Sequence, residues 1–224
     1  MSKKIRILST KLLREASMNQ FSAAGIEVVV RPFIRIEISG NITLPPAQKA
    51  DAIITSVNAL KALTGIRHQL PPFQTIYCIS GKTEARVRET FDARIIARPY
   101  ASELVAIMLE ATHVYPLWFF KGNKALPTIP DGLAQAGIPF HAIEVYQNTA
   151  IPHVLREDFE AILFFSPTAV ESFVQYNIIP DNTITFAIGK TTAAALRPYA
   201  KQVVISEVPT EESVRKAVVN YFNL

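Results

Sequence analysis

Two short polar motifs occur twice in the chain, each time directly after an apolar run typical of a β-strand. Ser56 has a counterpart in Ser166, and Gly81-Lys82-Thr83 has a counterpart in Gly189-Lys190-Thr191. A helix that begins after a strand presents unpaired N–H groups and the positive end of its dipole, which together bind anions. Taken singly, each motif is better explained as a helix cap, because Ser and Thr are preferred at that position. Four such positions in repeated segments, however, indicate a ligand with several negative charges.

These motifs lie in a chain that alternates short β-branched or aromatic runs with longer amphipathic stretches, a pattern typical of α/β proteins with parallel sheets. Ligands of such sheets bind outside the carboxyl ends of the strands, where both motifs are expected to lie. The predicted strands are Ile5–Ser9, Glu27–Pro32, Ala52–Thr55, Thr75–Ile79, Arg94–Ala97, Leu117–Phe120, Ala142–Tyr146, Ala161–Phe165, Thr185–Ile188 and Gln202–Ser206. The predicted helices are Leu12–Ala24, Val57–Ala62, Thr83–Thr90, Ser102–Glu110, Thr128–Ala136, Thr168–Tyr176, Thr191–Ala200 and Thr210–Phe222.

An internal repeat predicts two doubly wound domains. Ala52–Leu63 matches Ile162–Phe173, so each half of the chain contains the same strand and helix start. The opening segment, whose helix ends at Gly25, resembles a later segment whose helix ends at Gly137. The repeated segments therefore occur in swapped order along the chain.

This order assigns the N-terminal segment to the C-terminal domain. We expect residues 1–34 and 152–224 to form one discontinuous domain and residues 38–146 to form the other. The chain then crosses between the domains at residues 33–38 and 145–150, where polar and apolar residues alternate. Alternation of this kind predicts a two-stranded β-ladder that serves as a hinge. A tandem duplication without the swap is the alternative.

Composition limits the class of protein. With 49% hydrophobic and 19% charged residues, the 224-residue chain is too apolar for intrinsic disorder. The net charge of +4 is modest and the basic residues are scattered, so no nucleic-acid partner is expected.

No apolar run reaches the roughly 20 residues that span a bilayer, and polar residues between Arg6 and Lys11 exclude a signal peptide. A single cysteine, Cys78, excludes an intramolecular disulfide, and no heptad pattern indicates self-association. We expect a cytoplasmic monomer.

Several other chemistries lack the motif that they need. A nucleotide P-loop requires a glycine five residues before Gly-Lys, where this chain has Ile76 and Ile184. Ser166 lacks the G-x-S-x-G turn of a hydrolase nucleophile, and no G-x-G-x-x-G is present. The chain has four histidines, His68, His113, His141 and His153. None has metal-ligand spacing to Cys78 or to another histidine, so no metal site is predicted.

Tyr146 lies in the second predicted crossing, beside the expected interdomain cleft. A phenol with an ordinary pKa near 10 stays protonated at neutral pH and donates a hydrogen bond. Tyr146 can therefore act on a ligand, or it can be a packing residue at the domain junction.

Three segments in combination resemble the uroporphyrinogen-III synthase family. They are Phe164-Phe-Ser-Pro-Thr-Ala-Val170, Phe186-Ala-Ile-Gly-Lys-Thr-Thr-Ala193 and Val145-Tyr-Gln-Asn-Thr149. Val208-Pro-Thr-Glu211 and Leu117-Trp-Phe-Phe-Lys-Gly-Asn123 support the resemblance. It extends in order over nearly the whole chain.

The resemblance implies two flavodoxin-like α/β domains joined by a β-ladder, and it implies a reaction. Hydroxymethylbilane, a linear tetrapyrrole that carries carboxylates on every ring, is cyclised with inversion of ring D to uroporphyrinogen III, without a metal or an organic cofactor. Loss of the terminal hydroxyl gives an azafulvene. Attack through the substituted carbon of ring D gives a spiro intermediate, which fragments and recloses. The resemblance also allows a transient contact with the enzyme that supplies hydroxymethylbilane.

The resemblance assigns a role to individual residues as well. Tyr146 matches the family's conserved tyrosine and would help the hydroxyl to leave. The residues expected to bind the substrate are Ser56, Gly81, Lys82, Thr83, Gly122, Asn123, Ser166, Pro167, Thr168, Gly189, Lys190, Thr191 and Thr192.

The chain departs from the family pattern at three places. Val57-Asn58 replaces a proline and a polar or basic residue, Lys11 replaces an arginine, and no arginine follows Gly122. Lys121 and Lys124 could supply the missing positive charge. A non-catalytic binding module for a tetrapyrrole or another polyanion on the same scaffold is the alternative function.

Overall fold

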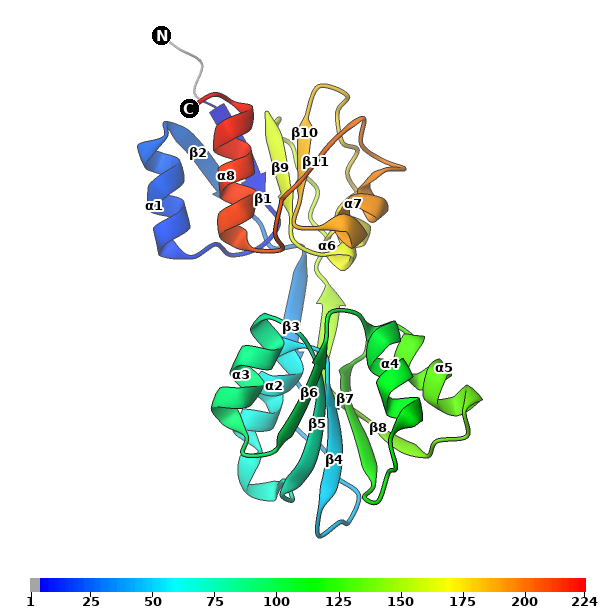
Figure 1. Cartoon of the computed structure of the whole chain (residues 1–224). Coiled ribbons are helices and arrows are strands. Elements are labelled where there is room, and N and C mark those ends of the chain that lie inside the picture. The colour runs from blue at the N-terminus through cyan, green and yellow to red at the C-terminus, as the bar shows by residue number, and fades with distance from the viewer. Residues whose placement is uncertain (1–4) are drawn as a thin grey trace. The chain divides into compact units, whose positions relative to one another are not determined.

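The structure is a computed structural model that describes residues 5–224, and it divides into two compact units (Figure 1). Unit 1 contains the chain up to Arg35 together with Thr149–Leu224, and unit 2 contains Ile36–Asn148. The chain therefore leaves unit 1 once and returns to it once.

Unit 1 contains a five-stranded parallel sheet in the order β11-β10-β9-β1-β2. Its strands are β1 (Ile5–Ser9), β2 (Ile26–Val30), β9 (Ala161–Phe164), β10 (Ile184–Ala187) and β11 (Gln202–Ile205). Its helices are α1 (Glu15–Ala23), α6 (Pro167–Val174), α7 (Lys190–Leu196) and α8 (Glu211–Tyr221). Helices α1 and α8 cover one face of the sheet, where Phe21 and Val214 are buried against Ile7. Helices α6 and α7 cover the other, where Phe173 and Leu196 are buried.

Unit 2 contains a six-stranded sheet in the order β3-β8-β7-β4-β5-β6, and the pairs from β8 to β6 are parallel. Its strands are β3 (Ile34–Ile38), β4 (Ala50–Ile54), β5 (Phe73–Ile79), β6 (Arg94–Arg98), β7 (Leu117–Gly122) and β8 (Phe140–Ala150). Its helices are α2 (Val57–Gly65), α3 (Lys82–Thr90), α4 (Ala101–Glu110) and α5 (Thr128–Gln135), with a 3₁₀ turn at Arg67–Gln69.

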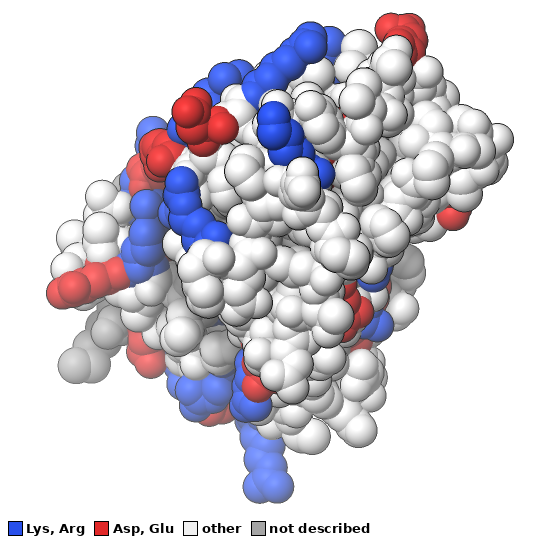
Figure 2. Space-filling model, turned by 90° about the horizontal axis from the view of Figure 1, so that it is seen from below, with Lys and Arg blue, Asp and Glu red and all other residues white. Residues whose placement is uncertain are grey.

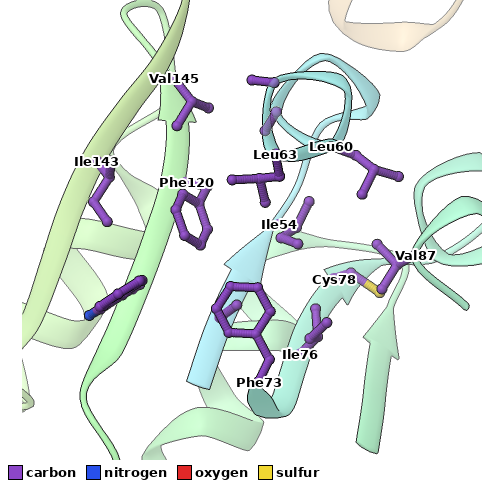
Figure 3. Packing of buried hydrophobic residues seen from close by; sticks show 14 of the residues in the cluster. Ile54, Leu60, Leu63, Phe73, Ile76, Cys78, Val87, Phe120, Ile143 and Val145 are labelled. Carbon is purple, nitrogen blue, oxygen red and sulfur yellow. The ribbon is translucent and has the colours of Figure 1, made fainter. Parts of the chain in front are cut away.

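Both faces of this sheet are also covered. Figure 3 shows the cluster under α2 and α3, in which Leu63 and Val87 lie near Ile54 and Phe120 of the sheet. On the other face, α4 and α5 bury Leu104 and other residues against β4, β5 and β7. The predicted class, α/β with parallel sheets, is confirmed by both units.

Strands β3 and β8 carry the chain between the units and pair with each other. The Ser39 N–H donates to the Val145 carbonyl at 3.0 Å, and the Ile151 N–H donates to the Phe33 carbonyl at 3.0 Å. This pairing runs antiparallel, because the position on β8 falls as the position on β3 rises. Strand β8 is longer than the predicted Ala142–Tyr146 and extends from Phe140 to Ala150.

Two helices have a boundary that differs from the predicted one: α1 at its start and α7 at its end. Helix α1 begins at Glu15 rather than at Leu12, because Arg14 has an extended backbone and its N–H donates to the Glu211 carboxylate. Helix α7 ends at Leu196 rather than at residue 200, because Pro198 has no N–H to continue the helical hydrogen bonds. The other predicted elements are present, with ends that shift by a few residues.

The distribution of charged side chains and the length of the apolar helices agree with the composition of the chain. In Figure 2, Lys and Arg side chains are mixed with Asp and Glu and separated by broad uncharged areas, so the face drawn has no continuous basic surface. Within residues 5–224, no helix is long and apolar enough to cross a membrane.

Candidate active site

The carboxyl edge of the unit 2 sheet brings together residues from four parallel strands. Ser56 follows β4, Gly81 follows β5, Gly122 ends β7, and Tyr146 lies in β8. These strands are neighbours in the order β8-β7-β4-β5, and the carboxyl ends of parallel strands meet at one edge. The unit 2 residues of the predicted site therefore share an edge.

The carboxyl edge of the unit 1 sheet carries the repeated motif. Ser166 follows β9 and Gly189 follows β10, and these two strands are direct neighbours. Lys11 lies two residues beyond the end of β1, which is the other neighbour of β9. Each unit thus presents a polar edge of its own.

Ser56 and Ser166 occupy the same local geometry. The Ser56 Oγ accepts a hydrogen bond from the Asn58 N–H at 3.0 Å, and the Ser166 Oγ accepts one from the Ala169 N–H at 3.1 Å. Both residues are extended N-caps of the helix that follows, and both are half-buried. An accepting hydroxyl keeps its own proton, so each serine can cap its helix and also donate to an anion.

The first turn of α6 differs from that of α2 in its next two residues. Pro167 lies at the start of α6, where its missing N–H costs no hydrogen bond. The Thr168 Oγ1 lies 3.1 Å from the Ser166 Oγ, so the two hydroxyls form one polar pair. At the corresponding place in unit 2, Val57 and Asn58 offer no second hydroxyl.

The two glycine loops are less alike than their sequences. Gly81 has φ +87° and ψ −128°, a conformation that side chains with a Cβ rarely adopt. Gly189 has φ 179°, which is extended backbone open to any residue, and its nearest potential Cβ contact is Pro209 at 3.9 Å. Only the unit 2 loop requires glycine for its backbone.

The polar residues that follow these glycines divide into exposed and buried ones. Lys82, Lys190 and Thr191 are exposed, so their donors can reach a ligand. Thr83 and Thr192 are 6% and 2% exposed, so these two side chains mainly support the start of their helices. The repeat aligns Thr83 with Thr191, yet the structure buries one and exposes the other.

Tyr146 lies directly over Gly122. The tyrosine is half-buried and the glycine is buried. A Cβ added to Gly122 would come within 2.4 Å of the Tyr146 Cζ. Asn123 hydrogen-bonds to both backbone groups of Asn148, with Oδ1 accepting at 2.8 Å and Nδ2 donating at 3.3 Å. Gly122 and Asn123 therefore contact β8 and its tyrosine.

The sequence does not reveal that Glu211 is a buried carboxylate beside the carboxyl edge of the unit 1 sheet, because the first turn of a helix commonly carries acidic residues. Its side chain is 8% exposed and forms an ion pair with the Lys11 Nζ at 2.7 Å. It also accepts from the Ser17 Oγ at 2.7 Å and from the Arg14 N–H at 2.9 Å. Burial by itself raises the pKa of Glu211, but these three donors outweigh it and lower the pKa to about 2. The residue is ionised at neutral pH.

Lys11 is held from two sides. Its ammonium lies 4.8 Å from the centroid of the Phe165 ring, a distance suited to a cation–π contact. Phe165 directly precedes Ser166, so the ring contact of Lys11 ties the loop after β1 to the serine loop after β9, and its ion pair with Glu211 ties the same loop to the start of α8. The side chain of Lys11 is 39% exposed and remains accessible to an anion.

Metal and thiol chemistry have no arrangement to support them in the described residues. Among residues 5–224, no group of three or more His, Cys, Asp and Glu side chains could hold a metal ion. Cys78 is buried, and burial raises the pKa of its thiol to about 11, so the thiol is protonated at neutral pH.

Comparison with known proteins decides the family. A family model described as uroporphyrinogen-III synthase HemD matches residues 16–215. The chain belongs to the uroporphyrinogen-III synthase family. The resemblance that the sequence motifs carry is therefore confirmed, and the protein is a lyase of tetrapyrrole biosynthesis that acts on a tetrapyrrole.

Solved structures of uroporphyrinogen-III synthases share the fold. The synthetase of Helicobacter pylori 26695 is 18% identical with a TM-score of 0.69, over 97% of this chain and 99% of that one. A mutant synthase of the extremely thermophilic bacterium Thermus thermophilus is 16% identical with a TM-score of 0.66, over 98% of both chains. No match is found among curated protein sequences.

Proposed function

We propose that the protein converts hydroxymethylbilane to uroporphyrinogen III with inversion of ring D, and that Tyr146 is its catalytic residue. The observation that carries this proposal is the position of Tyr146 on the polar edge of unit 2, in a chain of the uroporphyrinogen-III synthase family. The phenol donates a hydrogen bond to the terminal hydroxyl of the substrate, which leaves as water and gives an azafulvene. Little further acid–base chemistry is required, because the pyrroles supply the electrons.

The polar edges bind the carboxylates of the substrate. Exposed or half-buried donors are available on both units, namely Ser56, Lys82, Ser166, Thr168, Lys190 and Thr191. Hydroxyl groups and N–H groups at helix starts hold carboxylates without burying a full positive charge. Gly81, Gly189 and Pro167 shape the loops, while Thr83 and Thr192 support the helix starts behind them.

Orientation is the main task of these contacts. Ring D must be attacked through its substituted carbon rather than through the free position, and both routes start from the same azafulvene. A protein that fixes the chain of rings in the productive arrangement favours the spiro route. The rings lose their conformational entropy on binding, so this loss no longer adds to the barrier of the reaction. Binding by many weak donors serves this purpose, since each carboxylate fixes one ring.

The two chain crossings act as the hinge of this cycle. We take residues 33–38 and 145–150 as the linkers and propose that the two units reorient about them when substrate binds. X-ray scattering of the protein with and without a non-reactive tetrapyrrole tests this step. A change in the profile supports the hinge, and identical profiles contradict it.

The substrate could also pass directly from the enzyme that produces it through a transient contact.

Tyr146→Phe tests the proposed role of the phenol. We expect kcat to fall by about 100-fold, which is within the range for a lost general acid, while KM stays near the wild-type value. Far-UV circular dichroism of the variant should match that of the wild type. Unchanged kcat would remove Tyr146 from the mechanism. If the protein were instead a non-catalytic binding module, hydroxymethylbilane would close spontaneously to isomer I in its presence.

A further inference from the structure

The pairing of β7 with β8 is interrupted at one residue beside Tyr146. Phe120 pairs with Ile143 and Lys121 with Glu144, but Gly122 pairs with Tyr146, so Val145 has no partner on β7. An extra residue of this kind is a β-bulge, and it reverses the face on which the following side chains lie. In a regular strand, Tyr146 would lie on the same face as Glu144.

The bulge places Tyr146 on the face that α2 and α3 cover. Ile143 and Val145 are buried in the cluster that contains Phe120, and Tyr146 packs against that same cluster. Figure 3 shows Ile143 and Val145 on β8 next to Phe120 of β7. Val145 and Tyr146, two consecutive residues of β8, thus contact one face, which strict alternation would forbid. The serine-capped start of α2 lies on this face as well.

Gly122 provides the space that the tyrosine ring occupies. A Cβ at this position would lie 2.4 Å from the Tyr146 Cζ, 2.5 Å from Cε2 and 2.9 Å from the phenol oxygen. Gly122 has no positive φ, so its backbone would accept another residue. The ring of Tyr146, and not the backbone of Gly122, therefore excludes a side chain here.

Asn123 holds the backbone of β8 beyond the bulge. Its N–H donates to the carbonyl of Tyr146 at 3.3 Å. Its side chain pairs with the N–H and the carbonyl of Asn148, as a further residue of β7 would do. The end of β7 and Asn123 after it therefore fix the Tyr146 backbone, and the tyrosine ring rests on the glycine.

We propose that Gly122 is a positioning residue for the established family reaction: together with the bulge at Val145, it directs the hydroxyl of Tyr146 toward the carboxyl edge of the sheet. The effect on turnover rests on the proposed function of Tyr146, whereas the packing of the ring on the glycine does not. Any side chain at position 122 displaces the phenol, and a displacement of about 1 Å costs about 100-fold in rate.

Gly122→Ala tests this role when it is combined with variants of Tyr146. We expect kcat of Gly122→Ala to fall by about 100-fold with little change in KM. The double variant Gly122→Ala/Tyr146→Phe should be no slower than Tyr146→Phe, because both changes remove the same hydrogen bond. Gly65→Ala is the matched control, since Gly65 has nothing within 4 Å of an added Cβ and lies at the end of α2. Its kcat should equal that of the wild type.

A stability cycle tests the packing without any assay of turnover. Gly122→Ala should lower the Tm in the wild-type background and leave it unchanged or raise it in the Tyr146→Ala background, where no ring is displaced. This cycle remains informative if the single variant folds poorly, because Tyr146→Ala restores the space. Equal Tm changes in both backgrounds would overturn the packing argument.

Wild-type kcat in Gly122→Ala, or losses that multiply in the double variant, would overturn the positioning role. If the wild type forms only isomer I, the proposed function fails while the stability cycle still decides the packing.

Discussion

The ammonium of Lys11 and the carboxylate of Glu211 form an ion pair at 2.7 Å, between the loop after β1 and the start of α8. Glu211 is almost fully buried and also accepts hydrogen bonds from Ser17 and from the backbone of Arg14. One carboxylate therefore joins the first and the last helix of unit 1 at the edge that carries Ser166. The same contact orients the only lysine in the loop after β1.

Glu211→Gln should destabilise the protein by about 2–3 kcal/mol, because it leaves buried donors without their charged acceptor. Equilibrium unfolding in urea measures the loss. Glu212→Gln is the control, since the Glu212 side chain is 40% exposed whereas that of Glu211 is 8% exposed. Its loss should be smaller, because water reaches this carboxylate and weakens its ion pair. Equal losses for the two variants would contradict the role given to Glu211.

Acid should destabilise the wild type partly through Glu211. The pKa of this carboxyl in the folded protein is about 2, below the ordinary value of 4.5. A lowered pKa contributes stability above the unfolded value, and this contribution is lost as the pH falls from about 4.5 toward 2. The contribution is about 3 kcal/mol by linkage. Unfolding free energies between pH 6 and pH 3 should fall less steeply in Glu211→Gln, and parallel curves would exclude the effect.

Substitution of glycine by alanine should change the stability of the protein differently in the two glycine loops. Gly81→Ala places a Cβ at φ +87° and should cost about 1–3 kcal/mol of stability. Gly189→Ala meets extended backbone and open space, so it should be neutral or stabilise by up to about 1 kcal/mol. Thermal unfolding of the two variants gives the comparison. Similar shifts in Tm would show that the two loops are equivalent after all.

Ser56 can be tested for its two roles separately. Ser56→Ala removes both the cap and the donor, so stability should fall by about 1 kcal/mol and KM should rise. Ser56→Asp keeps a strong cap but places a negative charge where a substrate carboxylate is expected. Its stability should match the wild type while KM rises by about 10-fold or more, as for a lost hydrogen bond to a charged group. Wild-type KM in Ser56→Asp would show that Ser56 is a cap only.

The fold class can be predicted because its signals are local. Runs such as Ala161–Phe164 are β-branched or aromatic and end at a capping serine, so strand and helix boundaries follow from a few neighbouring residues. The predicted end of α7 is wrong even though Pro198 indicates the true one. The predicted start of α1 is wrong because the true start depends on Glu211, which is distant in sequence.

The site can be predicted only in part. The serines and the tyrosine stand out by type and spacing, and the resemblance that they carry is confirmed at the level of the family. Two features cannot be predicted, because both depend on contacts across the sheet. The bulge at Val145 decides the face of Tyr146, and the burial of Thr83 but not Thr191 breaks the sequence repeat.

The central claim is that this protein makes uroporphyrinogen III, and the product isomers test it most directly. Purified protein is added to freshly prepared hydroxymethylbilane, the products are oxidised to porphyrins, and isomers I and III are separated by chromatography, with heat-denatured protein as the control. We expect isomer III to predominate and its initial rate to rise in proportion to the protein concentration. Isomer I alone, formed at the rate of the denatured control, would contradict the account.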